Sequence, residues 1–417
     1  MNTEEALLPY CVLDLSDEKG ALCGRILGDL GADVIQIERP GGDPQRSIGP
    51  FHGGGADPEK SLFWFAYNAN KRGITLDIES AQGKEIFRDL VRRTDVVVES
   101  FHPGYMDSLG LGYSALSQIN RGLIMVSITP FGQSGPYSGY KGCDIVCTAM
   151  GGFSYMIGEP DQAPLRISFP QAYLHAGSEA AVATLIALYY KGITGQGQFV
   201  DLSIQHSMVS LTGNAIPFWE MNGVILRRVG HLRGGVSLNI KQRQLWQCKD
   251  GFVSFWILGG GFGEKSNRAL AEWMDEEGMA DDFVRSVDWH YFDQSKTEPE
   301  VQRHLEEMVA TFFLRYTKDK LYEEAIKRGI SLAPVSTSKD ILENPQFEDR
   351  GFWDDVRHDE LNSTIRYPGS FAKVSSTTPL RIRRRAPLIG EHNREIYEQE
   401  MGLSQEQVSR LKSANII

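Results

Sequence analysis

The sequence of 417 residues lacks the long apolar run and the cysteine spacing that mark several large protein classes. No apolar stretch approaches the roughly 20 residues that a membrane-spanning helix needs, so we expect no membrane segment. The cysteines show no zinc or redox spacing, and we expect no metal site. Reduced thiols are typical of cytoplasmic proteins, which is the location we predict. The five cysteines are Cys11, Cys23, Cys143, Cys147 and Cys248.

The chain is also short of positive charge. It has 43 lysines and arginines against 54 aspartates and glutamates, a net charge of −11, which argues against nucleic acid as a partner. The first residues, MNTEEALLPY, lack the basic region of a secretory signal, so we expect none. Hydrophobic residues make up 41% of the chain, enough to fill a large core, and the length predicts two lobes.

The first half of the chain alternates short apolar strands with helices. Such alternation predicts an α/β fold with a mostly parallel, doubly wound, Rossmann-like sheet. No GxGxxG motif is present, so a dinucleotide oxidoreductase has little support. We expect strands near Val12–Leu15, Val34–Ile37, Val96–Val98, Ile124–Ile128 and Phe199–Ser203, and helices near Gly20–Leu30, Ser80–Arg93 and His175–Tyr190.

The second half has a different pattern. We expect a large domain over 1–205, completed by 380–417, a connector over 206–235, a smaller α+β domain over 236–330, and a return connector over 331–379. Within the small domain, a Lys249-Asp250-Gly251 turn predicts a hairpin that ends at the glycine-rich stretch Gly259–Gly263. Further predictions are a helix from Ile204 that Pro217 limits, helices at Lys265–Met274, Val301–Tyr316, Lys318–Lys327 and Glu391–Met401, and a Ser404/Gln407 capping box.

One segment of the first half points to a ligand. In LGDLGADVIQIERPGGD (Leu27–Asp43), a buried strand delivers Glu38-Arg39 to the edge of the sheet. Ligands of open α/β sheets gather outside the carboxyl ends of the strands, where a fixed guanidinium suits an anion. The alternative is a surface arginine after an ordinary strand.

Six motifs together, including Leu27–Asp43, resemble the class III CoA-transferases. This family includes formyl-CoA, carnitine and benzylsuccinate CoA-transferases and the α-methylacyl-CoA racemases. The resemblance covers almost the whole chain, with the motifs in the family's order. It implies coenzyme A and acyl-CoA as substrates, no permanently bound cofactor, and interlocked dimers with active sites between one large lobe and the partner's small lobe. The other motifs are FAYNANKRGITLD (Phe65–Asp77), ESFHPG (Glu99–Gly104), SITPFGQSGPY (Ser127–Tyr137), TGQGQ (Thr194–Gln198) and RRAPLIGEH (Arg384–His392).

The same resemblance assigns residues to the binding of CoA. Arg39 matches the arginine that binds the nucleotide portion, and Arg72 belongs to an Asn-Lys-Arg signature. Phe101 and Gly104 lie in the loop that cradles CoA, and Lys141 aligns with a lysine near the nucleotide. Cations and free loop amides suit its phosphates. The alternatives are an ion pair of Arg72 with Asp77 or Glu99, and a solvated Lys141.

Several positions depart from the family's pattern. Where the family has a longer loop with Ala-Gly-Pro, this chain has Ser16-Asp17-Glu18-Lys19-Gly20, whose two acids would repel a diphosphate. Ser100 and Ser108 stand where asparagine and arginine are usual. A complete CoA pocket is therefore doubtful.

The family's nucleophile is an aspartate just before the helix that leads to the TGxGQ turn. Counting back from that turn places Tyr173 at its site. A phenol has no carbonyl carbon and cannot become a CoA thioester, and with a pKa of about 10 it is mostly protonated. Asp144 is the best substitute, because Glu179 lies about 9 Å of helical rise further on. The racemase chemistry also lacks its histidine, which is Cys143 here, although His175 remains a candidate base.

These residues predict a non-nucleophilic subunit of a heteromeric CoA-transferase. The chain resembles the succinyl-CoA:benzylsuccinate type, in which one of two related subunits lacks the aspartate. A related subunit would supply the aspartate, and Gly259–Gly263 would form the small-lobe wall of its site. Succinyl-CoA and an aromatic dicarboxylate are the expected substrates. Two alternatives remain open: a homodimeric acyl-CoA transferase or isomerase that uses another residue, and a CoA-binding protein without turnover.

Overall fold

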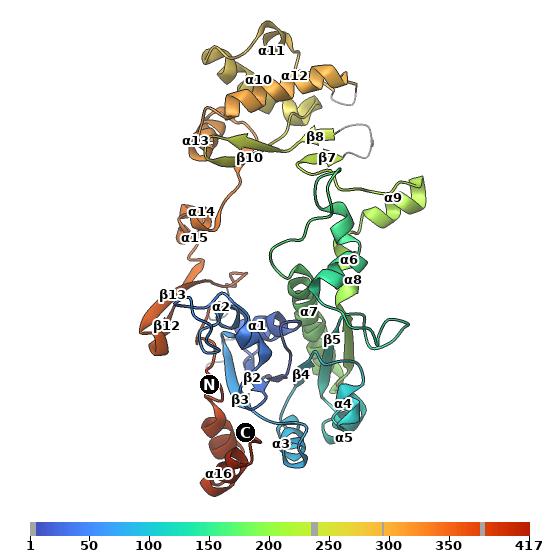
Figure 1. Ribbon diagram of the computed structural model, residues 1–417, viewed down its shortest axis with the longest axis vertical. Helices are drawn as coiled ribbons and strands as arrows, with labels where there is room; N and C mark the ends of the chain where they lie inside the picture. The colour runs from blue at the N-terminus through green and yellow to red at the C-terminus, as the bar shows by residue number, and fades with distance from the viewer. Residues whose placement is uncertain (1–5, 235–240, 294–295, 376–379) are drawn as a thin grey trace. The chain divides into compact units, whose positions relative to one another are not determined.

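The computed structural model describes residues 6–234, 241–293, 296–375 and 380–417 (Figure 1). The chain divides into two compact units. The first comprises the chain up to Ser154, Arg166–Val224 and Glu348–Ile417. The second comprises Tyr155–Leu165 and Ile225–Phe347.

A six-stranded parallel sheet forms the centre of the first unit, in the order β3-β2-β1-β4-β5-β6. This confirms the predicted doubly wound α/β fold. The chain moves outward from β1 to β3 and then returns to start β4 beside β1, so the order reverses between β1 and β4. Ligands of such sheets bind outside the carboxyl ends of the strands at this switch point. The strands are β1 Cys11–Asp14, β2 Asp33–Glu38, β3 Lys71–Thr75, β4 Val96–Glu99, β5 Ile124–Thr129 and β6 Phe199–Ser203.

Helices cover both faces of this sheet because successive apolar strand residues point to opposite sides. Val12 of β1 belongs to one core with helices α1 and α7, and Leu13 belongs to the other with α3 and α5. The helices of this unit are α1 Ala21–Asp29, α2 Leu62–Asn68, α3 Ala81–Val91, α4 Tyr105–Ser108, α5 Tyr113–Ile119, α6 Asp144–Met150, α7 Gln171–Thr194, α8 Ile204–Leu211, α9 Ala215–Asn222 and α16 Gln405–Ser413, with short helical turns at Pro44–Ser47, Asp359–Leu361 and Arg394–Glu400. Helix α15 Pro345–Asp349 and the turn at Phe153–Met156 each contain residues of both units.

The long helix α7 packs closely on α1. A Cβ on Gly177 would lie 3.0 Å from the Cβ of Leu22, so the absence of a side chain at Gly177 permits this approach. The predicted helix was shorter, His175–Tyr190, whereas α7 begins at Gln171. Tyr173 therefore lies in the first turn of the helix. The helix predicted from Ile204 ends at Leu211, before Pro217, which lies in the first turn of α9.

A fully buried ion pair connects three strands of the sheet. The Nζ of Lys71 donates to Asp14 Oδ2 at 2.8 Å, to Asn68 Oδ1 at 2.8 Å and to Gln36 Oε1 at 3.0 Å. Both charged side chains are fully buried. Gly24 of α1 lies directly above, where a Cβ would collide with Asp14 at 2.0 Å. This network fixes the carboxyl end of β1.

The segment over residues 381–393 lies along the edge strand β3. Asn70, with a φ of 63°, accepts hydrogen bonds from the backbone of Arg383 and Arg384. Trp64 Nε1 donates to the carbonyl of Pro387, and the backbone of Gly73 exchanges hydrogen bonds with His392. These contacts satisfy backbone groups that an open sheet edge would leave unpaired.

The second unit contains a three-stranded antiparallel sheet in the order β11-β10-β9. The predicted hairpin is present as β9 Leu245–Cys248 and β10 Gly251–Phe255, and β11 Leu332–Pro334 joins its other edge. The expectation that Gly259–Gly263 precedes the helix is wrong, because α10 begins at Gly260. The remaining elements here are β7 Leu232–Gly234, β8 Lys241–Arg243, α10 Gly260–Glu276, α11 Asp282–Ser286, α12 Pro299–Phe313, α13 Lys318–Arg328 and α14 Ser338–Leu342.

Two features appear near the C-terminal end of the chain. A hairpin, β12 Trp353–His358 with β13 Ser363–Pro368, occupies a segment for which the sequence predicted no strands. The capping box of Ser404 and Gln407 at the start of α16 is confirmed. Across the described residues, no helix is both long enough and apolar enough to span a bilayer.

We expect Lys71→Met to destabilise the first unit by about 3–5 kcal/mol, because it leaves the buried carboxylate of Asp14 without its charge partner. The exposed residue Lys412 provides a matched control, and Lys412→Met should change the unfolding free energy by less than about 0.5 kcal/mol. Urea unfolding followed by circular dichroism measures both. Equal stability of the two variants would contradict the structural role of the Lys71 network.

Candidate functional site

A cleft of about 380 Å³ opens at the carboxyl edge of the sheet, at the switch point between β1 and β4. We call it the switch-point cleft. The ends of β1 to β4 and the loops that follow them form its walls. Its lining residues are Leu15, Asp17, Ile37, Glu38, Arg39, Pro40, Asp43, Pro44, Leu76, Asp77, Ile78, Glu79, Ser100, Phe101, Tyr105 and Asn415.

The lining of this cleft is strongly acidic. Arg39 is the one cation among these lining residues. Arg46, which lies outside the lining, neutralises Glu38 with two hydrogen bonds of 2.6 and 2.8 Å. Asp17 is paired with Lys19. The acidic lining residues are Asp17, Glu38, Asp43, Asp77 and Glu79.

The pKa of one of these acids, Asp43, lies well above its ordinary value. Burial raises the pKa of Asp43 from 3.8 to about 7, and the negative charges of Glu38 and Asp17 act in the same direction. Hydrogen bonds to Gln45 oppose the shift only in part. The raised pKa of Asp43 indicates that its surroundings disfavour a further negative charge.

Two of the predicted CoA residues lie in this cleft. Arg39 is exposed at its wall. The ring of Phe101 packs against Tyr105, with 4.7 Å between ring centroids. Tyr105 donates to Glu79 at 2.6 Å, and burial together with that bond raises its pKa to about 12. Arg39 and Phe101 are therefore brought together, and their roles toward CoA stay predictions.

Gly104 lines a second cavity, also of about 380 Å³, on the other side of β4. Its φ of 83° places it in the left-handed region at the start of α4. Glu99 lies at the base of this cavity, where burial raises its pKa to about 7, and its carboxylate accepts a hydrogen bond from the amide of Phe101 at 2.7 Å.

The structure places the other two predicted cations outside both cavities. Arg72 pairs with Asp33, Glu395 and Glu400 at the amino end of the strands, so its guanidinium is engaged far from the switch-point cleft. The ion pair considered from the sequence is formed, but with acids other than Asp77 and Glu99. Lys141 is exposed in the loop between β5 and α6, and its role stays a prediction.

Tyr173, which the sequence predicts at the position of the family's aspartate, is 7% exposed. Burial raises the pKa of its phenol above the ordinary value of 10, and the charges of Glu18 and Asp17 raise it further. The hydroxyl is therefore protonated at neutral pH. No oxyanion nucleophile exists at this position.

Asp144, the candidate substitute for the nucleophilic aspartate, binds backbone amides at the start of α7. Its Oδ1 accepts hydrogen bonds from the amides of Ala172 at 2.8 Å and Tyr173 at 3.4 Å. Burial raises its pKa, while these two bonds act in the opposite direction. The side chain thus satisfies backbone donors that the first turn of a helix leaves free.

Glu18 is the residue that sequence reasoning missed as a neighbour of Tyr173. Burial and the charge of Asp17 raise its pKa, and no described side chain forms a hydrogen bond or ion pair with its carboxylate. The sequence carried no signal for this, because Glu18 and Tyr173 meet only through the contact of Leu22 with Gly177 four residues further along each segment. Ser100, which departs from the family's pattern, donates its hydroxyl to Asp17 Oδ1 at 2.8 Å and thereby connects the loops after β1 and β4.

An open parallel sheet with a ligand-sized cleft at its switch point, joined to a separate antiparallel unit, defines an α/β enzyme scaffold. Residues 11–393 match CoA-transferase family III, and the chain belongs to that family. Members of this family use CoA thioesters as substrates. Among the described residues, no group of three or more His, Cys, Asp or Glu side chains is arranged to hold a metal ion.

Curated relatives and solved structures share nearly the full length of the chain. Subunit BbsE of succinyl-CoA:(R)-benzylsuccinate CoA-transferase from Thauera aromatica is 36% identical over 93% of this chain and 92% of its own. The beta subunit of succinyl-CoA–L-malate CoA-transferase from Chloroflexus aurantiacus is 29% identical over 95% and 94%. A crystal structure of a CAIB/BAIF family protein from Brucella suis superposes with a TM-score of 0.81 at 27% identity, covering 95% of this chain and all of its own.

We expect the raised pKa of Asp43 to appear in the pH dependence of stability. Between about pH 4 and pH 7 the folded protein keeps a proton that the unfolded chain has released, so stability falls as the pH rises through this range. Asp43→Asn should show a smaller fall, because it removes this group. Urea unfolding at several pH values measures it. The control Asp89→Asn, at an exposed position, should show the same fall in stability as the wild type. If Asp43→Asn also loses as much stability between pH 4 and pH 7 as the wild type, the raised pKa of Asp43 is refuted.

Proposed function

We propose that this chain is the non-nucleophilic subunit of a heteromeric class III CoA-transferase. The complex moves CoA from an acyl-CoA to a carboxylic acid, with succinyl-CoA as donor and an aromatic dicarboxylate such as benzylsuccinate as acceptor. A related subunit supplies the aspartate. The single observation that carries the proposal is the buried, protonated phenol of Tyr173 at the nucleophile position.

The chemistry of the transfer explains why this substitution decides the role. A carboxylate attacks the acyl-CoA thioester and expels CoA thiolate, giving a mixed anhydride. The thiolate then attacks the carbonyl carbon of the enzyme's own carboxyl group and releases the acid, leaving an enzyme–CoA thioester. The acceptor acid reverses these steps. A tyrosine side chain has no carbonyl carbon, so it cannot carry CoA through the second step.

The charge of the switch-point cleft supports the same role. CoA carries a diphosphate and a 3′-phosphate, which cations and free amides bind best. In this chain, Arg39 faces five acids across the cleft, and Arg72 is engaged elsewhere. We therefore expect the chain alone to bind CoA weakly, and its role is to complete the site of the partner through the second unit, including Gly259–Gly263.

The relatives support the substrate class and the assembly. The relatives from Thauera aromatica and Chloroflexus aurantiacus are both named as subunits of succinyl-CoA-dependent CoA-transferases. By analogy we assign succinyl-CoA and a dicarboxylate to the complex that contains this chain, and we propose the interlocked arrangement for its two subunits.

An exposed apolar face on α7 supports a protein partner. Val182, Ile186, Tyr189 and Ile193 follow helical spacing and are 57%, 63%, 74% and 69% exposed. The charged residues of the helix do not compete for this face, because Lys191 pairs with Asp95 and Glu179 accepts a hydrogen bond from Ser207. We assign this face to the aspartate-bearing subunit.

We expect the purified chain to transfer no CoA from succinyl-CoA, and the complex with its aspartate-bearing paralogue to be active. Tyr173→Phe in this chain should leave the activity of the complex unchanged, because the phenol takes no part in transfer. Liquid chromatography of the CoA esters measures the products. Robust transfer by the lone chain that is lost in Asp144→Asn or Glu18→Gln would refute the non-nucleophilic role.

We expect Ile186→Asp to weaken association with the partner at least tenfold, because it places a charge in an apolar contact. Ile326→Asp is the matched control, since Ile326 on α13 is 66% exposed. Size-exclusion chromatography of the mixed subunits with light scattering measures the assembly. The assignment of the α7 face fails when both variants assemble equally well.

Glu18 favours a second candidate, a homodimeric acyl-CoA enzyme that uses another residue. A desolvated carboxyl group beside a buried phenol is suited to proton transfer at the α-carbon of an acyl-CoA. Exchange of that proton in deuterated water, catalysed by the lone chain and lost in Glu18→Gln, would support this candidate over the first.

A further inference from the structure

The second cavity, of about 380 Å³, lies over one face of the sheet in the first unit. Glu99 of β4, Met125 of β5 and Phe199 of β6 line it. The register pairs Met125 with Phe199 and Glu99 with Ser127, and residues two apart on a strand point to the same face. The side chains of all four residues therefore lie on the cavity side of the sheet. Pockets of roughly 300–1,000 Å³ are typical of small-molecule sites.

Two carboxylates make this cavity acidic. Glu99 is 4% exposed, and Asp107 is exposed at the wall. No lysine or arginine is among the described lining residues, and within the described part of the chain neither carboxylate forms an ion pair. His102, also in the wall, has ring nitrogens 3.1 and 3.3 Å from two backbone carbonyl oxygens. The charge of this wall is therefore negative.

The carboxyl group of Glu99 can accept further hydrogen bonds. Its Oε2 accepts from the amide of Phe101 at 2.7 Å, and the hydroxyl of Ser127 also bonds to it. A carboxylate offers about four lone-pair sites, so acceptor capacity remains. Burial raises the pKa of Glu99 to about 7, and these two hydrogen bonds oppose the shift only in part. A cation beside Glu99 would favour the ionised form.

Aromatic and thioether side chains form the apolar part of the wall. Tyr113 of α5 packs against Phe199, with 5.7 Å between ring centroids and 38° between ring planes. Phe199 is 39% exposed. Met106 and Met125 line the same space. The faces of such rings attract cations, and methionine adapts to apolar groups of varied shape.

We propose that the second cavity binds a primary amine with an aromatic body, in its ammonium form. The ammonium group donates to Glu99, and charge-assisted bonds of this kind are the strong ones. The aromatic body packs on Tyr113, Phe199 and Met125. The negative wall disfavours carboxylates and phosphates. A metal ion does not suit the cavity, because the described residues contain no group of three or more His, Cys, Asp or Glu side chains arranged to hold one. This inference goes beyond the proposed function and does not depend on it.

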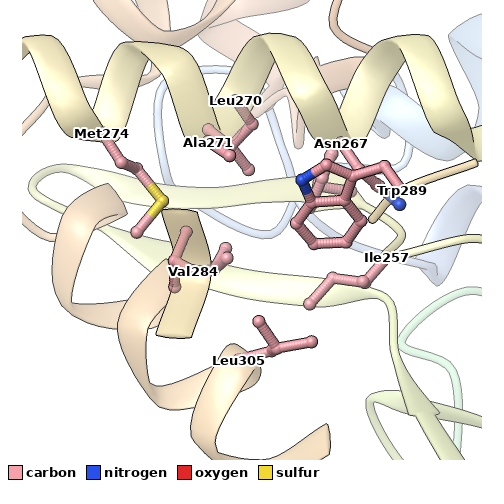
Figure 2. A pocket seen from close by; sticks show the side chains of 10 residues that line it. Ile257, Asn267, Leu270, Ala271, Met274, Val284, Trp289 and Leu305 are labelled. Atoms are coloured by element: carbon pink, nitrogen blue, oxygen red, sulfur yellow. The ribbon is translucent and has the colours of Figure 1, made fainter. Parts of the chain in front are cut away.

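Two other spaces in the chain fit this ligand less well. The switch-point cleft also has acidic walls, but Arg39 lies among them. The space in the core of the second unit has a volume of about 20 Å³, and apolar side chains such as Leu270, Val284 and Leu305 close around it (Figure 2). That volume accommodates about one water molecule. Negative charge, aromatic rings and sufficient volume occur together in the second cavity.

Isothermal titration calorimetry of the full chain with 2-phenylethylamine tests the site. We expect saturable binding, at least tenfold tighter than that of the uncharged and similarly shaped 2-phenylethanol. Equal affinities for the two compounds, or no saturable binding of the amine, would overturn the proposal.

Glu99→Gln should weaken binding of the amine at least tenfold, because it removes the charge and keeps an acceptor for the amide of Phe101. Phe199→Leu, at a partly exposed position, should weaken binding about two- to fivefold through loss of the ring face. Glu85→Gln, at an exposed position on α3, is the matched control and should bind the amine as the wild type does. Loss of binding in Glu79→Gln, with binding retained in Glu99→Gln, would place the amine in the switch-point cleft and overturn the assignment.

Discussion

The buried pair of Lys71 and Asp14 is the interaction on which the geometry of the first unit depends. Two opposite charges in a fully buried position are tolerated only when further hydrogen bonds satisfy them, and here Asn68 and Gln36 supply those bonds. Because Asp14 ends β1, the network fixes the point at which the switch-point cleft begins. The same pair also requires a glycine at position 24 of α1, because a Cβ there would collide with Asp14. The ion pair, the position of α1 and the edge of the cleft therefore depend on one another.

Motifs that resemble a ligand-binding signature serve the scaffold in this chain. Asn70 holds the returning segment 381–393, Lys71 anchors β1, and Arg72 joins three acids at the opposite end of the strands. Asp144 likewise satisfies amides of α7. These residues therefore indicate that the chain has the fold of the family. They do not indicate whether it carries out nucleophilic chemistry, which we expect to depend on the first turn of α7 and the loop after β1.

The sequence predicted the parallel sheet well, because strand periodicity and the order of the elements are local signals. It also predicted that Arg39 follows β2 at the edge of the sheet, where this residue lines the switch-point cleft. The match of Tyr173 to the nucleophile position stays a prediction. Two features escaped because they depend on contacts between distant residues. Arg72 pairs with Glu395 and Glu400, more than 300 residues away. Glu18 meets Tyr173 only through the packing of α1 on α7. The start of α10 at Gly260 was missed for a local reason, since it involves the close approach of Gly263 to Leu258.

The proposed non-nucleophilic role is consistent with the negative charge of the loop after β1. A carboxylate nucleophile must stay ionised, yet the negative charges of Asp17 and Glu18 act on position 173, and the pKa of Glu18 is already raised. An aspartate introduced at Tyr173 would meet the same field and the same burial, and its own pKa would rise. Under the proposed role, this chain therefore differs from a nucleophilic relative by more than the single residue at position 173. The acids of the loop after β1 act electrostatically on the residue at 173, so we expect that an ionised nucleophile at 173 would also need a less acidic loop.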